Sequence, residues 1–427
     1  MSRRSPSLRE FIALIALLFS MVAFAIDSML PSLPEISAEL GLANVNRAQL
    51  VIIVFVFGTG FGQLLAGPLS DSFGRKPVIT IGLGIFLLAS LWAFLASSFE
   101  SLLMARFVQG LGIAAPRTVT HAMVRDLHSG RHMARVVSFA MMLFVLVPAV
   151  APYIGQTIML AFGWRYIFVA FQIGALIAIT WLAVRQPETL PPDKRTPFRG
   201  KVIVSACREV FTNRKVVTCT LGMTLGYTCI FAYLVSAQQV YVVWLDAGYD
   251  FPLYFALTAI LAGGASFLNA VLVMRLGMLW LATFGYLAIF LLSIAFGVVI
   301  LSETFGLPTL LWLFVGWSTA MFFLLGLCLA NQNALALEPM GHIAGMASAI
   351  VGSAASLLCV VFAIPIGQLF DGTGLPLVAG VGICSAAALG LNLSIWRQTV
   401  PTVTVMETPP ESGPSPLRQP GQDLGKQ

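Results

Sequence analysis

The stretch AGPLSDSFGRKP, residues 66–77, lies between two segments that are almost wholly apolar. It brings together Asp71, Arg75 and Lys76, and each neighbouring segment is long enough to cross a membrane as a helix. Gly74 permits a tight turn, and the proline that ends the stretch suits the first turn of a new helix. The stretch is therefore predicted to be a short loop at the lipid headgroups, between two spanning helices.

The composition of the whole chain agrees with a membrane protein. Of its 427 residues, 58% are hydrophobic and 10% are charged, and the mean hydropathy is +0.90. The apolar segments lack the alternation of a barrel strand, so the fold class is predicted to be an all-α membrane protein. Twelve spanning helices are expected, at 9–30, 48–69, 77–97, 101–122, 136–158, 164–184, 216–243, 253–273, 279–301, 309–336, 343–366 and 376–397.

Two hydrophilic intervals divide the chain. We expect an N-terminal six-helix bundle at 1–184, a linker at 185–215, a C-terminal six-helix bundle at 216–397 and a disordered tail at 398–427. A short surface helix at 201–212 is left open. Neither interval is long enough for a catalytic domain, so function is expected to lie within the membrane bundle.

The net charge of +6 reflects topology rather than nucleic-acid binding. With the N-terminus inside, 20 of the 24 Lys and Arg residues fall on the cytoplasmic side, which is the positive-inside pattern. Both termini are then cytoplasmic, and we expect a bacterial inner membrane protein that contacts lipid. The first helix resembles a secretory signal, but its apolar run continues past Ala25, so we expect it to be retained. The six cysteines show no metal-ligand spacing and are expected to pack.

A faint internal duplication fits the two halves. Segment five contains APYIGQ, 151–156, and its counterpart segment eleven contains IPIGQ, 364–368. Two related bundles around a central site are the arrangement that transporters use for alternating access.

The opening loop resembles the signature of the major facilitator superfamily, G-x-L-x-D-x-x-G-R-K. The matching residues are Gly67, Leu69, Asp71, Gly74, Arg75 and Lys76. An acid at a helix C-terminus is disfavoured by the helix dipole, so Asp71 needs a stabilising partner. The resemblance implies that Asp71 faces the positive N-terminus of the eleventh helix, near Gly341 and His342. It also implies that this loop acts as a cytoplasmic latch.

A second pattern of that family, R-x-x-Q-G, occurs at Arg106, Gln109 and Gly110. Arg106 is predicted to lie roughly 7 Å inside the fourth helix, where an arginine needs a partner or a water-filled cavity. Asp27, the only acid well inside any segment, is predicted to lie roughly 5–6 Å from the same outer face. We expect the two to face a shared cavity, where Asp27 binds a proton and Arg106 tunes its affinity. An interfacial position near a helix end is the alternative for each.

Arg117 lies eleven residues past Arg106 and points the same way on a helix. It could extend a cationic stripe for an anionic substrate, or it could mark the inner interface together with His121. The sequence favours the interface.

Segment five contains Pro148, Pro152 and Gly155, which predict a kinked helix and a close helix contact. Drug antiporters of the resembled family have a Gly-Pro-x-x-Gly pattern here, from which this chain departs at Ala151. The bicyclomycin- and chloramphenicol-resistance branch has a similar Ala-Pro. That branch also resembles this chain in AIDSMLPSLP, 25–34, and in the Gly-Trp-Arg of 163–165.

Other function classes lack their motifs. FGTGFG, 57–62, lacks the strand-turn-helix setting of a nucleotide site, so helix packing is expected there. An enzyme would need several facing catalytic groups, and a channel would show repeated polar rings. No cofactor, metal or nucleic-acid partner is expected.

The combined interpretation is a proton-coupled secondary transporter that exports amphipathic, drug-like compounds by alternating access. The coupling to protons is implied by the family resemblance, because no ATP-binding motif is present. We expect the chain to act as a monomer. The alternative is a carrier for one endogenous metabolite, which would be anionic if Arg106 and Arg117 bind it.

Overall fold

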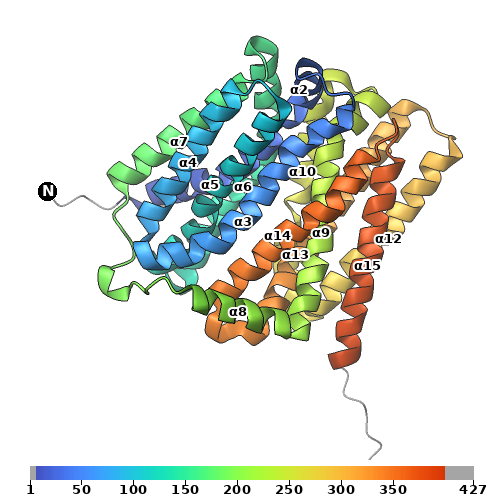
Figure 1. The fold of residues 1–427 in the computed structure, drawn as a ribbon. Coiled ribbons are helices and arrows are strands. Elements are labelled where there is room, and N and C mark those ends of the chain that lie inside the picture. Colours follow the sequence, from blue (N-terminus) through green and yellow to red (C-terminus); the bar gives the residue numbers. More distant parts are fainter. Residues whose placement is uncertain (1–5, 400–427) are drawn as a thin grey trace, which may run out of the picture.

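The computed structural model describes residues 6–399, and every regular element within them is a helix (Figure 1). The first half contains α1 (Leu8–Asp27), η1 (Leu30–Ser32), α2 (Leu33–Glu39), η2 (Val45–Gln49), α3 (Leu50–Phe73), α4 (Arg75–Leu95), α5 (Phe99–Leu127), α6 (Gly130–Phe162) and α7 (Tyr166–Arg185). The linker contains η3 (Pro192–Lys194) and α8 (Gly200–Thr212). The second half contains α9 (Arg214–Gln239), η4 (Val240–Trp244), η5 (Gly248–Asp250), α10 (Phe251–Ala262), α11 (Ala265–Leu276), α12 (Met278–Ser302), α13 (Leu307–Leu337), η6 (Glu338–Ile343), α14 (Ala344–Gln368) and α15 (Leu375–Thr399).

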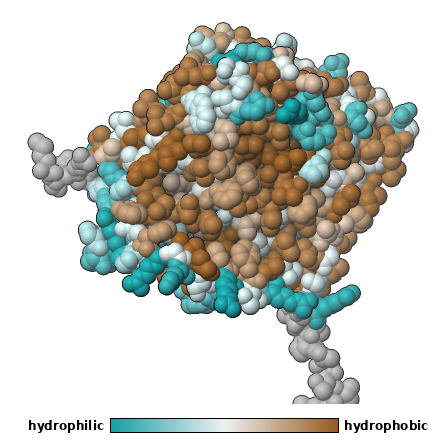
Figure 2. Space-filling model, viewed as in Figure 1, coloured by the Kyte–Doolittle hydropathy of each residue, from teal (hydrophilic) through white to brown (hydrophobic). Residues whose placement is uncertain are grey.

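The helices account for the twelve predicted spans. Ten segments of the described chain are long and apolar enough to cross a membrane, and one of them, 307–368, contains both α13 and α14. The twelfth span is α5, whose mean hydropathy is lowered by Arg106, Arg117 and charges near its ends. Figure 2 shows the expected surface, a broad apolar band with hydrophilic residues gathered along its upper and lower edges.

Two elements differ from the sequence prediction. The first apolar segment does not end at Leu30, because prolines in the first turns of η1 and α2 let the chain restart as helix and continue to Glu39. The predicted single helix at 253–273 is two helices, α10 and α11, separated at Gly263 and Gly264. The surface helix left open in the linker is present as α8. Residues 400–427 of the predicted tail lie outside the described residues.

The two halves meet along α3 and α14 and along α6 and α10. The glycines of the 57–62 stretch lie in helix contacts, as predicted. A Cβ at Gly58 would come within 2.2 Å of the Phe107 carbonyl oxygen of α5, and one at Gly60 would come within 2.9 Å of Leu357 of α14. Small residues on α3 therefore let it pack closely on both sides.

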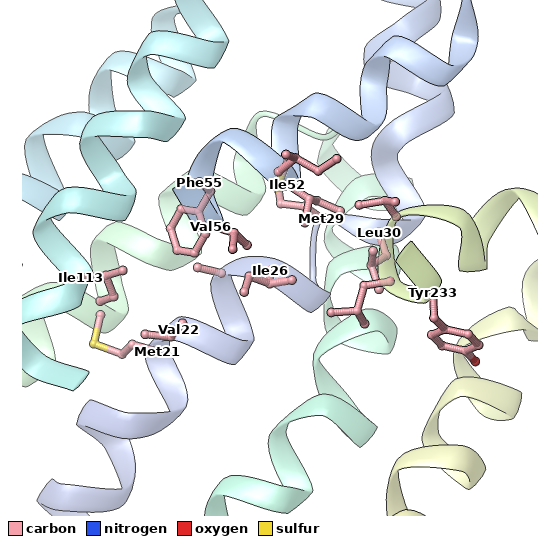
Figure 3. Close-up of a cluster of buried hydrophobic side chains, with 14 of the residues drawn as sticks. Met21, Val22, Ile26, Met29, Leu30, Ile52, Phe55, Val56, Ile113 and Tyr233 are labelled. Carbon is pink, nitrogen blue, oxygen red and sulfur yellow. The ribbon is translucent and has the colours of Figure 1, made fainter. Parts of the chain in front are cut away.

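The apolar core is continuous across the halves. Figure 3 shows Ile26 of the first segment beside Val56 of α3, with Leu30 on the side of the cluster toward Tyr233 of α9. All four side chains are buried. We call the end of the bundle that carries the 73–75 turn the loop end, and the opposite end, where α3 begins, the outer end.

Candidate functional site

Asp27 is the last residue of α1 and is 3% exposed. It is the only buried carboxylate among residues 6–399, and none of the ion pairs in that range includes it. Its surroundings are apolar, with Ile26 and Met29 also buried. A carboxylate enclosed in this way is costly to keep charged.

Arg106 of α5 is fully buried and has its own set of partners. Its guanidinium donates to the carbonyl oxygens of Val51 (3.0 Å) and Ala25 (3.0 Å) and to the Gln109 side chain (2.9 Å). It also lies 4.3 Å from the centre of the Phe55 ring. Arg106 thus ties α1 and α3 to α5.

The structure differs from the expected pairing of Asp27 with Arg106. The guanidinium reaches the backbone of Ala25, two residues before Asp27, but no ion pair joins the two side chains. Backbone carbonyl oxygens and a side-chain amide accept the hydrogen bonds of the Arg106 guanidinium instead. Sequence patterns cannot identify such partners, because every residue has a backbone carbonyl. Asp27 also stands at the end of α1 rather than a turn before it.

Arg117 and His121 lie further along α5, toward the loop end. Arg117 is half-buried, while His121 is exposed and its ring centre lies 4.4 Å from that of Phe19. Arg106 is enclosed and already bonded, so the three do not form one open cationic stripe in this structure.

The loop predicted to be a latch is organised by Arg75. Its guanidinium donates to Asp71, to Asp126 of α5 (2.9 Å) and to the Ser70 hydroxyl (2.7 Å). The Arg75 side chain is 5% exposed, whereas that of Asp71 is 44% exposed. Arg75 therefore fixes the loop to the first half, and Asp71 is left facing outward from it.

Sequence analysis missed Glu188, which holds the linker to the same loop. Its carboxylate accepts the backbone N–H groups of Arg75 (2.9 Å) and Lys76 (3.1 Å) at the start of α4, and those of Thr189 and Leu190. Gly74, with φ +103°, makes room for it, since a Cβ there would lie 2.6 Å from the carboxylate. The signal that could have found Glu188 was the start of α4, a helix N-terminus with no acidic residue in its first turn, which favours a carboxylate supplied from elsewhere in the chain.

Lys76 extends this attachment. Its Nζ donates to the carbonyl oxygens of Ala183 and Gln186, both at 2.8 Å, at the end of α7. The loop is thus joined to α5, α7 and the linker by polar contacts.

Asp71 and the start of α14 line one small cavity of about 60 Å³ at the loop end. Gly67 also lines it from α3, and Gly345 and Met346 line it from α14. No hydrogen bond joins the Asp71 carboxylate to α14 among the described residues. Asp71 thus faces the N-terminal turn of α14, as the family resemblance implies, but does not contact it here.

The segment-five residues all lie within α6, which is one helix containing Pro148 and Pro152. Gly155 touches the backbone beyond Asp27, because a Cβ there would lie 1.9 Å from the Ser28 carbonyl oxygen. The close helix contact predicted for Gly155 is therefore present, and it lies next to the buried acid.

The Gly-Trp-Arg stretch of 163–165 anchors α2 at the outer end. Trp164 Nε1 donates to Glu39 at 2.6 Å, and Arg165 pairs with the same carboxylate and donates to the Ala96 carbonyl oxygen at 3.1 Å. These contacts fix the segment that follows Asp27.

The described residues form two bundles of membrane helices, and the family match identifies the chain as a membrane transporter rather than an enzyme. Residues 13–363 match the Major Facilitator Superfamily, so the chain belongs to that family. The resemblance noted in the signature loop is confirmed at this level.

Curated relatives and solved structures agree with the family. The chain is 29% identical over 380 residues to a bicyclomycin resistance protein homolog from Haemophilus influenzae, which covers 88% of this chain and 93% of the relative. It is 31% identical over 242 residues to the multidrug resistance protein MdtL of Vibrio parahaemolyticus, covering 56% and 59%. The crystal structure of a D-xylose-proton symporter has the same fold, with a TM-score of 0.71 and 18% identity over 89% of this chain and 95% of the symporter.

Proposed function

We propose that this transporter exports amphipathic, drug-like compounds in exchange for protons. The similarity to proteins named for bicyclomycin and multidrug resistance supports the substrate class. Alternating exposure of a central site between two bundles is the mechanism that the fold supports.

The burial of Asp27 carries the proposal of proton coupling. A lone carboxyl in an apolar setting is stable while neutral, and it loses its proton when water or a cationic substrate reaches it. Binding of proton and of cationic compound to one carboxylate would then exclude each other, which is the requirement for exchange. Asp27 is assigned as the proton and substrate site.

Arg106 is assigned a positioning role in place of direct charge tuning. Its bond to the Ala25 carbonyl oxygen fixes the end of α1 against α3 and α5, which keeps Asp27 at one depth. Gly155 holds α6 against the residues after Asp27 from the other side.

The loop of Gly67, Asp71, Gly74, Arg75 and Lys76 is proposed as the latch of the loop end. The Asp71 carboxylate, partly exposed and paired with Arg75, lies across a cavity from the start of α14, which supports this role because a helix N-terminus attracts negative charge. No hydrogen bond between described residues joins the Asp71 carboxylate to α14. The latch would close when the halves approach at that end.

The remaining assignments concern placement. Positive charge concentrates near the loop end, so we place that end and both termini in the cytoplasm of a bacterium, with the protein in the inner membrane. The proposed domain limits are 1–184, 185–215, 216–397 and 398–427, and the nearest helix ends, Arg185, Arg214 and Thr399, support the first three. A monomer suffices for this mechanism, because both halves lie in one chain.

The test is uptake into everted membrane vesicles with an acidic interior. The panel includes ethidium and tetraphenylphosphonium as amphipathic cations, chloramphenicol as a neutral compound and citrate as an anion. We expect the amphipathic compounds to accumulate and a protonophore to stop them. Accumulation of citrate alone, or accumulation that survives the protonophore, would support the metabolite carrier or an uncoupled route and overturn the proposal.

A further inference from the structure

The outer end holds a group of neutral side chains that join the two halves. We call Asn46, Gln49, Gln239 and Gln368 the amide clamp. Asn46 and Gln49 lie on η2 in the first half, while Gln239 and Gln368 are the last residues of α9 and α14 in the second half. The four carboxamides therefore meet where the ends of three elements come together.

Asn46 is the centre of the clamp. Its Nδ2 donates to the carbonyl oxygens of Gln368 and Phe370, both at 3.1 Å, and its Oδ1 accepts from Gln239 Nε2 at 2.7 Å. Gln368 Nε2 returns a bond of 2.7 Å to the backbone oxygen of Asn46. Asn46 thus binds carbonyls at the C-terminal end of α14, which have no partner within their own helix.

Gln49 adds a second connection and is 1% exposed. Its Nε2 donates to Gln239 Oε1 at 2.6 Å and to the Gly367 carbonyl oxygen at 3.1 Å. Gly367 is required for this approach, because a Cβ there would lie 2.2 Å from Gln49 Oε1. The backbone of α14 and the side chain of Gln49 are therefore fitted to one another.

The distribution of bonds between the halves is one-sided. Of the hydrogen bonds that cross from one half to the other through side chains that the structure describes, six belong to the clamp and a seventh, Gln156 to Tyr249, lies at the same end. The eighth, Ser353 to Gly60, lies midway along α3 and α14. At the loop end the described residues form no side-chain hydrogen bond between the two halves. Asp71 faces α14 there across a cavity.

Neutral amides suit a contact that must break and re-form. On opening, each carboxamide exchanges its partner for water, and no charge is left without a counter-charge. Losing one such bond corresponds to about a 2- to 10-fold change in an equilibrium. Several such bonds together would strongly favour the state in which the outer end is closed. They would still allow that end to open.

We propose that the amide clamp is the lock of the outer gate, with Asn46 as its centre, and that it sets how often the outer end opens. This inference rests on the proposed function, because a gate has meaning only if the two ends open in turn. It adds carboxamide residues, which do not titrate.

The test measures distances between spin labels in the full-length protein, reconstituted in nanodiscs, with the native cysteines replaced by alanine. One pair of labels, at Ala43 and Ser302, reports the outer end, and a second pair, at Leu127 and Arg275, reports the loop end. We expect Asn46→Ala to raise the population with a long outer distance about tenfold or more. Gln368→Ala, which removes one bond, should raise it less.

Asn44→Ala is the matched control. Asn44 caps the same short helix η2 through the Asn46 N–H, and its side chain has no hydrogen bond to the second half among the described residues, so Asn44→Ala should leave the outer distances unchanged. Unchanged distances in both folded clamp variants, or an equal shift in the control, would overturn the lock. The measurement needs no substrate, so failure of vesicle transport would overturn the proposed function and leave this result standing.

Discussion

Arg106 shows how a family motif can be found correctly and given the wrong partner. Its position in R-x-x-Q-G and its depth were predictable. Both indicated that its charge needed hydrogen-bonding partners within the membrane. These partners are the carbonyl oxygens of Val51 and Ala25 and the side chain of Gln109, rather than Asp27. The sequence identifies the two buried charges, whereas only the packing of three helices decides what each one contacts.

Replacing Arg106 by lysine should lower stability. A lysine keeps the charge but cannot supply the planar fork that reaches two carbonyls and an amide, and a loss of about 2 kcal/mol is expected. Thermal unfolding of the purified protein measures this loss of stability. Arg117→Lys is the control and should lower the melting temperature less. An unchanged melting temperature together with a shifted pH profile of transport would instead indicate direct tuning of Asp27.

Gly155→Ala should be strongly disruptive because the new methyl group would meet the Ser28 carbonyl oxygen at 1.9 Å. Separating α6 from this backbone is expected to cost about 1–3 kcal/mol and to reduce transport. Gly174→Ala, where nothing lies within 4 Å, is the matched control and should tolerate the change. Equal melting temperatures for the two variants would contradict the contact.

At the scale of elements, the linker proves to be part of the first half. Its residue Glu188 completes the start of α4, and Thr196 N–H binds the Asp71 carbonyl oxygen. The composition of residues 185–215 predicted a connector. It could not reveal that the Glu188 carboxylate also accepts the N–H groups of Arg75 and Lys76, because these come near Glu188 only after α4 and α7 pack.

Glu188→Ala should loosen this attachment. Four N–H groups would lose their acceptor, with an expected cost of about 1–3 kcal/mol and faster proteolysis of the linker. Limited proteolysis of the reconstituted protein measures the rate. Asp193 is an exposed acid in the same linker. In the control variant Asp193→Ala, the protease should cleave the linker at the wild-type rate.

Asp71→Asn tests the latch between the halves. The change removes the charge that the N-terminus of α14 attracts, so the state closed at the loop end should become about 2- to 5-fold less populated. The spin-label pair at Leu127 and Arg275 reports this as longer distances. Glu100→Gln, at the other end of the bundle, is the control. An unchanged distribution of distances between these labels in Asp71→Asn would contradict the latch role of Asp71.

At the scale of the whole molecule, the sequence predicted most of the architecture. Twelve apolar segments and the bias of basic residues were sufficient for the helical class, because a membrane leaves few other solutions for a backbone. The restart of the first segment as η1 and α2, the break between α10 and α11, and the amide clamp were not predicted. The first two follow local proline and glycine positions, whereas the amide clamp depends on contacts between segments distant in sequence.

The distribution of charge also separates the two halves. Between residues 216 and 397 no charged side chain is buried, whereas the first half buries Asp27, Arg75 and Arg106. If the central cycle depends on a proton within the membrane, the first half must hold it, and Asp27 is the carboxylate available there.

The most direct test of this claim is proton release on substrate binding. The purified protein is placed in weakly buffered detergent solution with a pH indicator, and a compound that the vesicle assay shows to be transported is added. The wild-type protein should release protons, while Asp27→Asn, folded and monodisperse, should release none. Equal proton release from Asp27→Asn would contradict the assignment of Asp27 as the coupling site.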